Sequence, residues 1–179
     1  LHRAARAIVD RHEGRFPDTL EALEALPGVG RSTAGAILAL GHGRRATILD
    51  GNVKRVLARV AGVTGWPGRP AVQRILWRLA EALTPREPEQ VGPYTQAMMD
   101  LGATLCVRRR PLCAACPVAT ACLARTEGLQ EHLPTPRPAR QVPHRQALAW
   151  LVRAPAGLWL ERRPAPGLWG GLWCPPQLD

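Results

Sequence analysis

The sequence predicts a mainly α-helical protein that continues into the start of an α+β region. Two observations carry this prediction. Apolar residues recur at spacings of three and four from residue 1 to about residue 125, as in amphipathic helices. After a stretch rich in proline and arginine, two short apolar runs, 146–153 and 157–162, flank a Pro-Ala-Gly turn, a pattern typical of strands.

The helices are predicted from their apolar faces and their end signals. Gly14 and Pro17 end the first helix, and Asp18 with Glu21 forms a capping-box pattern that starts the second. Pro27 and the glycines after it force a tight turn before the third. The predicted helices cover residues 1–12, 19–25, 32–40, 51–60, about 72–83 and 94–105.

The charge of the chain indicates a polyanionic partner. The 179 residues carry a formal net charge of +10, and Lys54 is the only lysine among 24 basic side chains. No run of 18 apolar residues exists, so no membrane span is expected. The chain opens inside a helical pattern, and we expect it to be an internal piece of a longer protein.

Four cysteines close together form the most informative motif. Cys106, Cys113, Cys116 and Cys122 have the spacing C-x6-C-x2-C-x5-C, directly after a helical segment. Four thiolates can surround one metal centre, and sulfur ligands favour zinc or an iron–sulfur cluster. The spacing leaves both open, because zinc sites usually have two C-x2-C pairs and this loop has one.

A glycine-rich turn between two predicted helices indicates a DNA anchor. Residues 26–31 read LPGVGR, a helix–hairpin–helix signature. The glycines let the backbone turn closely, so that N–H groups at the start of the next helix can face a phosphate. Such an anchor holds DNA without reading its bases. The predicted contacts are Gly28, Val29, Gly30, Arg31 and Ser32.

An acidic side chain follows this anchor in a strongly basic chain. Asp50 precedes the helix predicted at 51–60. Because phosphate repels a carboxylate, Asp50 needs a function at this place. One function is to stabilise a positively charged sugar as a base leaves, and the other is to cap the helix. The residue types alone leave both open.

A closer resemblance comes from four stretches in order: residues 26–37 (LPGVGRSTAGAI), 48–55 (ILDGNVKR), 96–103 (QAMMDLGA) and the cysteines. Together they resemble adenine DNA glycosylases of the MutY type, in the helix–hairpin–helix, iron–sulfur superfamily. The resemblance covers residues 1 to about 125. In addition, residues 167–175 (GLWGGLWCP) resemble the opening of that family's C-terminal Nudix-like domain.

The resemblance implies a monofunctional base excision repair enzyme. It would hydrolyse the N-glycosidic bond of adenine mispaired with 8-oxoguanine or guanine in double-stranded DNA, after flipping the adenine out. Asp50 would be the catalytic aspartate and Asn52 a neighbouring polar residue. The cysteines would hold a 4Fe–4S cluster. The implied DNA contacts beyond the hairpin are Lys54, Arg55, Arg108, Arg109 and Arg110.

The resemblance also implies four parts of the chain. They are a partial glycosylase domain (1–105), the cluster loop (106–125), a Pro/Arg-rich extended linker (126–144) and the truncated start of the Nudix-like domain (145–179). The family's general-acid glutamate has no match in these residues, so we expect the 179 residues alone to be inactive. We expect a monomer in the bacterial cytoplasm, associated with the nucleoid and with no membrane.

Two alternatives stay open. Endonuclease III shares the hairpin and the cysteine spacing, but its bifunctional members carry a lysine nucleophile where this chain has Ser32, and serine cannot form a Schiff base. The other alternative is a non-catalytic DNA-binding module stabilised by zinc on the four cysteines.

Overall fold

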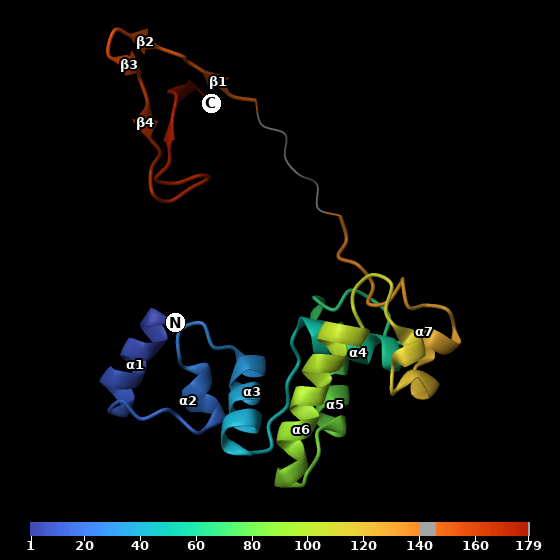
Figure 1. Ribbon diagram of the computed structural model, residues 1–179. Coiled ribbons are helices and arrows are strands. Elements are labelled where there is room, and N and C mark those ends of the chain that lie inside the picture. Colours follow the sequence, from blue (N-terminus) through green and yellow to red (C-terminus); the bar gives the residue numbers. More distant parts are fainter. Residues whose placement is uncertain (140–145, 179) are drawn as a thin grey trace. The chain divides into compact units, whose positions relative to one another are not determined.

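The structure is a computed structural model that describes residues 1–139 and 146–178. The chain divides into a helical unit, Leu1–Pro138, and a strand unit, Ala139–Asp179 (Figure 1). Within the described residues, no helix is both long and apolar enough to cross a bilayer. The four-part division stays a prediction, and its boundary at 144/145 lies outside the described residues.

The helical unit confirms a mainly α-helical chain. A π-helical turn, η1 (Leu101–Leu105), continues the helix before the first cysteine, and two 3-10 turns, η2 (Cys113–Ala115) and η3 (Ala119–Ala121), lie in the cysteine loop. The α-helices are α1 (His2–His12), α2 (Leu20–Glu24), α3 (Arg31–His42), α4 (Gly51–Val60), α5 (Pro70–Leu83), α6 (Pro88–Asp100) and α7 (Leu123–Thr126).

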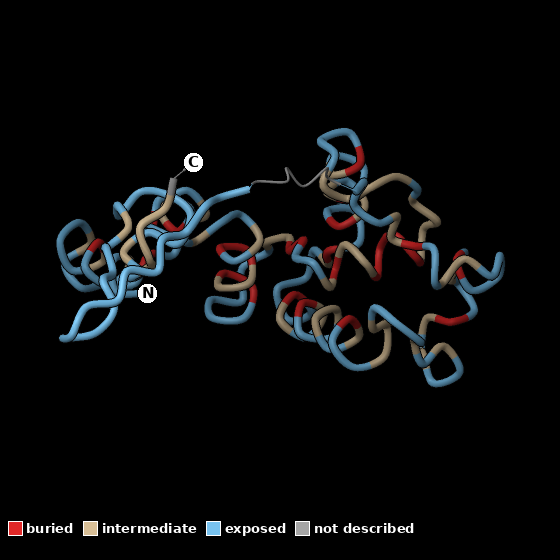
Figure 2. Tube along the Cα trace, turned by 90° about the horizontal axis from the view of Figure 1, so that it is seen from above, coloured by how far each residue is buried: buried red, intermediate tan, exposed pale blue. Residues whose placement is uncertain are grey.

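Two aliphatic clusters hold these helices together. Ala7, Leu23 and Leu38 pack α1, α2 and α3 against one another. Leu57 and Leu76 belong to the second cluster, which packs α4 against α5. Figure 2 shows the buried residues along the inner faces of the helices. Because α6 packs on both α3 and α4, it joins the two clusters.

The second helix is capped by a different residue from the predicted one. Thr19 is the N-cap of α2, and its Oγ1 accepts a hydrogen bond from Ala22 N–H at 3.3 Å. Asp18 instead pairs with Arg44, with 2.6 Å between Oδ2 and Nη2. This ion pair is exposed, so it stabilises the fold by at most about 1 kcal/mol, but it fixes the chain after α3 against the start of α2.

The chain after α7 differs from an extended linker over residues 126–139. We call residues 129–137 the strap, because they lie against the helical unit. Leu133 is 4% exposed, and its N–H donates to the Leu129 carbonyl oxygen at 2.9 Å. Thr135 Oγ1 accepts a hydrogen bond from Gly65 N–H at 2.9 Å. The remaining part of the predicted linker, 140–144, lies outside the described residues.

The strand unit consists of short antiparallel pairs. β2 (Arg153–Ala154) and β3 (Gly157–Leu158) form a hairpin around the predicted Pro-Ala-Gly turn. β1 (Leu148–Ala149) pairs with β6 (Gln177–Leu178), and β4 (Glu161–Arg162) pairs with β5 (Trp173–Cys174). None of residues 146–177 is buried. This unit therefore has no hydrophobic core among those residues.

Candidate functional site

The connection between α2 and α3 forms the predicted hairpin. Gly28 has a φ of +85°, in the left-handed region that favours glycine, and Val29 N–H donates to the Leu26 carbonyl oxygen at 3.0 Å. Gly30 is the N-cap of α3 and offers no side-chain cap. An added Cβ at Gly28 or Gly30 would meet nothing within 4 Å. The backbone at Gly28 and Gly30 is therefore open beside the start of α3, whose first N–H groups have no partner within the helix, an arrangement suited to a phosphate.

The next two predicted contacts have partners inside the protein. The guanidinium carbon of Arg31 lies 4.1 Å from the ring centroid of Trp77, a cation–π contact. Ser32 Oγ accepts a hydrogen bond from Leu49 N–H at 2.8 Å. The Ser32 hydroxyl thus holds the segment that leads to Asp50.

Asp50 ends an extended segment that packs on α3. Gly35 lies so close to the Thr47 carbonyl oxygen that a Cβ would overlap it, and Leu49 is buried. Asp50 is exposed and caps α4, because its Oδ1 accepts a hydrogen bond from Val53 N–H at 2.8 Å. Capping uses one carboxylate oxygen, so the two functions left open by the sequence are compatible in one side chain.

Asn52 and Arg55 connect the start of α4 to the turn η1. Arg55 Nη2 donates to Asn52 Oδ1 at 2.8 Å and to the Gly102 carbonyl oxygen at 2.6 Å. Its Nε donates to the Cys106 carbonyl oxygen at 2.7 Å. A Cβ on Gly102 would lie 2.7 Å from Asn52 Cβ, so glycine allows this approach. The sequence predicts that Arg55 contacts DNA, whereas these three bonds are internal.

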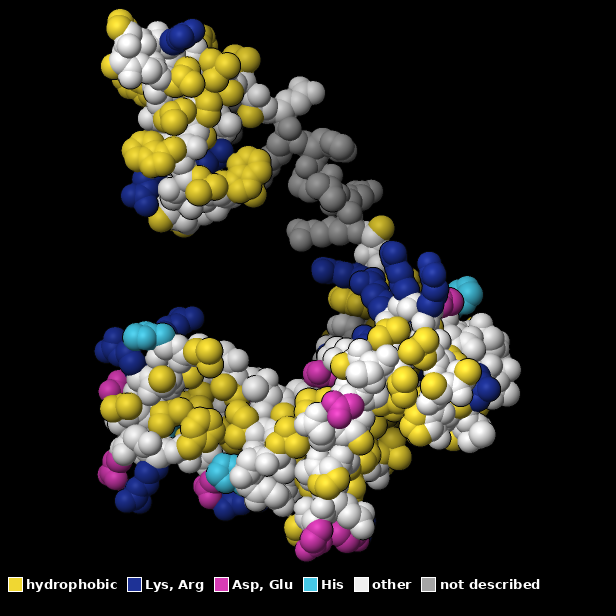
Figure 3. All heavy atoms as spheres, in the orientation of Figure 1, with side chains coloured by type: hydrophobic (Ala, Val, Ile, Leu, Met, Phe, Trp, Pro, Cys, Tyr) yellow, Lys and Arg dark blue, Asp and Glu magenta, His cyan; other side chains and the backbone are white. Residues whose placement is uncertain are grey.

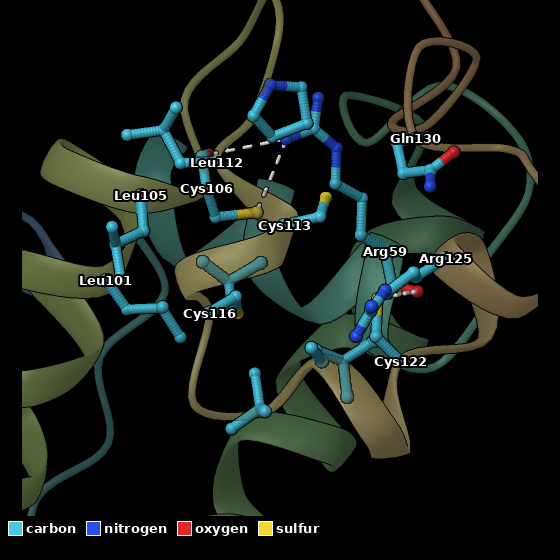
Figure 4. A pocket seen from close by; sticks show the side chains of 15 residues that line it. Arg59, Leu101, Leu105, Cys106, Leu112, Cys113, Cys116, Cys122, Arg125 and Gln130 are labelled. Carbon is cyan, nitrogen blue, oxygen red and sulfur yellow. Dashed lines mark hydrogen bonds between the residues drawn. The ribbon is translucent and has the colours of Figure 1, made fainter.

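The four cysteines line one pocket (Figure 4). Leu101, Leu105 and Leu112 form part of its apolar wall. Burial raises the pKa of the Cys113 thiol, and the other three cysteines raise it further by charge repulsion, while Arg59 lowers it. The other three sulfur groups therefore lie within electrostatic reach of Cys113.

Arg59 lies at the edge of this pocket and is 2% exposed. Its Nε donates to the Leu133 carbonyl oxygen at 2.8 Å, and its Nη2 donates to the Arg108 carbonyl oxygen at 3.1 Å. Its Nη1 donates to the Val107 carbonyl oxygen at 2.7 Å and to Cys106 Sγ at 3.3 Å. Within the described residues no carboxylate pairs with this buried charge. The Cys106 sulfur is the side-chain acceptor that this buried guanidinium contacts.

The donor set fits a sulfur-ligated group larger than one ion. No three His, Cys, Asp or Glu side chains in residues 1–139 and 146–178 converge enough to hold a single metal ion. One zinc ion would need its four sulfurs about 2.3 Å from a common point. The cysteines instead stand apart around a small pocket of about 20 Å³. A polynuclear iron–sulfur group spans such a separation with four thiolate ligands.

The predicted basic contacts near this pocket lie at the surface. Arg108, Arg109 and Arg110 are exposed, and Arg110 N–H donates to Glu131 Oε1 at 3.1 Å. Lys54, Arg108 and Arg109 line a second pocket together with the strap. Figure 3 shows Lys and Arg side chains gathered above α4.

Sequence analysis misses Arg59, Trp66 and Trp77. One signal for Arg59 was available, because it lies between two apolar residues, Ala58 and Val60, in the last turn of its helix. The two tryptophans had no comparable signal, since their partners, Arg137 and Arg31, come from distant segments.

Comparisons with known proteins agree with this geometry. The family model for the helix–hairpin–helix motif matches residues 11–40. An adenine DNA glycosylase of Buchnera aphidicola (from Acyrthosiphon pisum) is 35% identical over 99% of this chain and 50% of its own length. The human adenine DNA glycosylase is 45% identical over 74% of this chain and 24% of its own length.

A solved structure shares the fold of the helical unit. The structure of a thermostable thymine-DNA glycosylase matches with a TM-score of 0.58 and 31% identity, covering 70% of this chain and 56% of that one. The chain spans about half the length of the Buchnera protein. These similarities confirm the predicted resemblance: the chain carries the helix–hairpin–helix motif and is similar to adenine DNA glycosylases and to a thymine-DNA glycosylase.

Proposed function

We propose that the protein containing this chain is a monofunctional adenine DNA glycosylase of base excision repair. It hydrolyses the N-glycosidic bond of adenine opposite 8-oxoguanine or guanine in double-stranded DNA. The observation that carries this proposal is that Asp50 is exposed while the residue before it, Leu49, is hydrogen-bonded to Ser32 of the hairpin helix α3. Relatives named adenine DNA glycosylase support the same activity.

The hairpin supplies the DNA anchor in this proposal. Gly28, Val29 and Gly30 present backbone N–H groups to a phosphate, and the N-terminus of α3 adds its positive dipole end. These contacts are independent of sequence, so base selection falls to the pocket that receives the flipped adenine.

Asp50 acts on the sugar. As the bond to adenine lengthens, positive charge develops on the sugar, and the carboxylate oxygen not used for capping stabilises it. Asn52 is fixed by Arg55 beside it, so the polar groups at the start of α4 keep their positions during the reaction. Water then completes hydrolysis and leaves an abasic site.

Cys106, Cys113, Cys116 and Cys122 would hold a 4Fe–4S cluster. Such a cluster, when bound, supplies structural cross-linking or electron transfer and not bond cleavage. The adjacent cationic Arg59 balances the charge of thiolate ligands. Purified protein should be brown and contain both iron and inorganic sulfide; colourless protein with zinc would favour the zinc-stabilised module, because zinc is d10.

In this proposal the chain has four parts. They are a partial glycosylase domain over 1–105, the cluster loop over 106–125, a connecting segment over 126–144 that includes the strap, and the truncated start of a Nudix-like domain over 145–179. No residue within the chain matches the family's general-acid glutamate, so these 179 residues alone would not release adenine. The complete protein would act as a monomer on DNA in the bacterial cytoplasm.

Single-turnover strand scission tests the proposal. The cluster-loaded protein at its natural length is mixed with a duplex carrying adenine opposite 8-oxoguanine, and products are scored with and without alkali. Scission only after alkali supports a monofunctional glycosylase. Scission without alkali, or activity on oxidised pyrimidines instead, would assign the protein to the endonuclease III group.

Asp50→Asn is the matched variant for that assay. Asn caps a helix about as well as Asp, so the stability should change by a few tenths of a kcal/mol at most. The rate of adenine release should fall by at least about 100-fold, because the charge that stabilises the sugar is gone. An Asp50→Asn protein with the wild-type rate would refute the assignment of Asp50.

A further inference from the structure

The connection between α3 and α4 (Figure 1), which ends at Asp50, also contacts the end of α5. Arg45 Nε donates to the Pro85 carbonyl oxygen at 3.1 Å. Its Nη2 donates to the carbonyl oxygens of Glu81 at 2.9 Å and Thr84 at 3.3 Å. The acceptors lie 36 to 40 positions further along the chain. One guanidinium therefore joins two segments that are distant in the sequence.

The end of α5 needs such a donor. The last carbonyl groups of a helix have no N–H partner within it, and that end carries a partial negative charge. The last turn of α5 contains no basic residue of its own, and Pro85, two positions after the helix, brings no N–H. Arg45 therefore supplies, from another segment, both the donors and the positive charge that this helix end lacks.

Thr47 makes a second contact with the same helix end. Its Oγ1 lies 3.2 Å from Oγ1 of Thr84, a residue that is 4% exposed. Thr84 Oγ1 donates its proton to the Ala80 carbonyl oxygen at 2.7 Å, so the Thr47 hydroxyl is the donor between the two threonines. Arg45 and Thr47 are two positions apart, and in an extended chain such side chains lie on the same side.

The same segment is also held by α3. The Thr47 carbonyl oxygen lies against Gly35, and Leu49 N–H donates to Ser32 Oγ. Leu49 is buried in the cluster that packs α4 against α5. Asp50 follows directly and is exposed. The place of its carboxylate relative to the hairpin therefore depends on both α3 and α5.

We propose that Arg45 and Thr47 are positioning residues for adenine excision. They bind the segment 44–49 to the end of α5 and thereby fix where the Asp50 carboxylate stands relative to the target sugar. Neither side chain takes part in the chemistry, but a displacement of about 1 Å at a reacting group can cost about 100-fold in rate. This inference rests on the proposed function, because it takes Asp50 as the carboxylate that stabilises the sugar.

The dependence of the single-turnover rate on protein concentration tests these roles. Cluster-loaded protein at its natural length acts on a duplex with adenine opposite 8-oxoguanine, which gives the maximal rate and the half-saturating concentration separately. Arg45→Met should lower the maximal rate by about 10- to 100-fold, and Arg45→Lys, which keeps the charge without the planar fork, by less. Thr47→Val should lower it by about 2- to 10-fold, whereas Thr47→Ser keeps the hydroxyl and should retain the wild-type rate.

Arg78→Met is the matched control. Arg78 is exposed on α5 and lines the same surface pocket as Arg45, so the substitution removes the same charge from the same region. The two variants should have equal half-saturating concentrations, and Arg78→Met should keep the wild-type maximal rate. Rates are normalised to iron content and measured well below each thermal midpoint, so unfolded protein does not lower them. Equal maximal rates for Arg45→Met and Arg78→Met would overturn the positioning role and leave the proposed function intact.

Hydrogen exchange separates the contact with α5 from the reaction. The N–H of Leu49 is protected by its hydrogen bond to Ser32. In a peptide fragment that covers residues 46–53, Arg45→Met should accelerate exchange by about 10-fold, because the segment opens more often, and Arg78→Met should not. Unchanged exchange in Arg45→Met would overturn the proposal. Accelerated exchange in a protein whose wild type releases no adenine would support the contact and contradict only the proposed function.

Discussion

The Ser32 hydroxyl has two possible roles in the hairpin, an internal hydrogen bond or a contact with a DNA phosphate, and substitutions distinguish them. Its Oγ accepts a hydrogen bond from Leu49 N–H, the residue before Asp50. Ser32→Ala should lower the free energy of unfolding by about 1 kcal/mol, the cost of one partly buried hydrogen bond. It should also slow single-turnover excision, because the segment that carries Asp50 loses its tie to α3. Urea unfolding and the excision assay measure the two effects.

The neighbouring Thr33 provides the control, since it is exposed on the same helix. Thr33→Ala should change the stability by no more than about 0.5 kcal/mol. If Ser32 bound phosphate instead, its alanine variant would reduce the salt slope of DNA binding and leave the stability unchanged.

Arg59 is the residue with the largest expected effect on stability. Arg59→Met leaves the carbonyl groups of Leu133 and Val107 without their donor and should destabilise the protein by about 3–5 kcal/mol. Arg59→Lys should destabilise the protein by an intermediate amount, because an ammonium group cannot reach the same set of acceptors as the planar guanidinium. Urea unfolding and retained iron are the measurements. Arg125→Met, at an exposed arginine of the same pocket, should behave like wild type.

At the scale of elements, the close contact between α4 and η1 fixes Asn52 and Arg55. A Cβ at Gly102 would lie 2.7 Å from Asn52 Cβ and 3.3 Å from its backbone, so the two elements would have to separate. Gly102→Ala should destabilise the protein by about 1–3 kcal/mol and reduce the excision rate. Gly41→Ala in α3 is the control, because its Cβ would meet nothing within 4 Å. A Gly102→Ala protein as stable as Gly41→Ala would contradict the close contact.

Patterns of neighbouring residues predicted where helices and turns lie better than they predicted which distant residues contact each other. Apolar spacing places α4 at 51–60 as observed, and the glycines place the hairpin, because both depend on neighbours along the chain. The strap was harder to predict, because its prolines indicate an extended chain. The apolar pair Leu129 and Leu133, one helical turn apart, was the available signal for packing. The cap of α2 shows the same limit. Asp18 pairs with Arg44, and Thr19 caps the helix in its place.

The sequence motifs of the site could be predicted, but the hydrogen bonds that join its residues could not. The sequence indicates Asp50 and the four cysteines by type and spacing. The link from Asn52 through Arg55 to the carbonyl oxygen of Cys106 joins residues about fifty positions apart, and no local pattern contains it. Such long-range hydrogen bonds depend on how the helices pack.

At the scale of the whole molecule, the two units differ in what stabilises them. The helical unit has buried clusters, whereas residues 146–177 have none buried and expose Trp150, Trp159 and Trp173. A peptide of residues 139–179 should therefore show no cooperative thermal transition, because short two-stranded pairs without a core are marginal in water. Circular dichroism and tryptophan emission are the measurements. A sharp melting transition in the isolated peptide would contradict this prediction.

The hydrogen bond between Arg59 and Leu133 has a consequence for synthesis on the ribosome. Its partners are 74 positions apart, and Leu133 is made last. At ordinary translation speeds of 5–20 residues per second, Arg59 waits roughly 4 to 15 s for this acceptor. The four cysteines are made within that interval, and the last of them, Cys122, precedes Leu133 by 11 positions (133 − 122). The nascent chain thus presents all four thiols before Arg59 gains its acceptor in the strap.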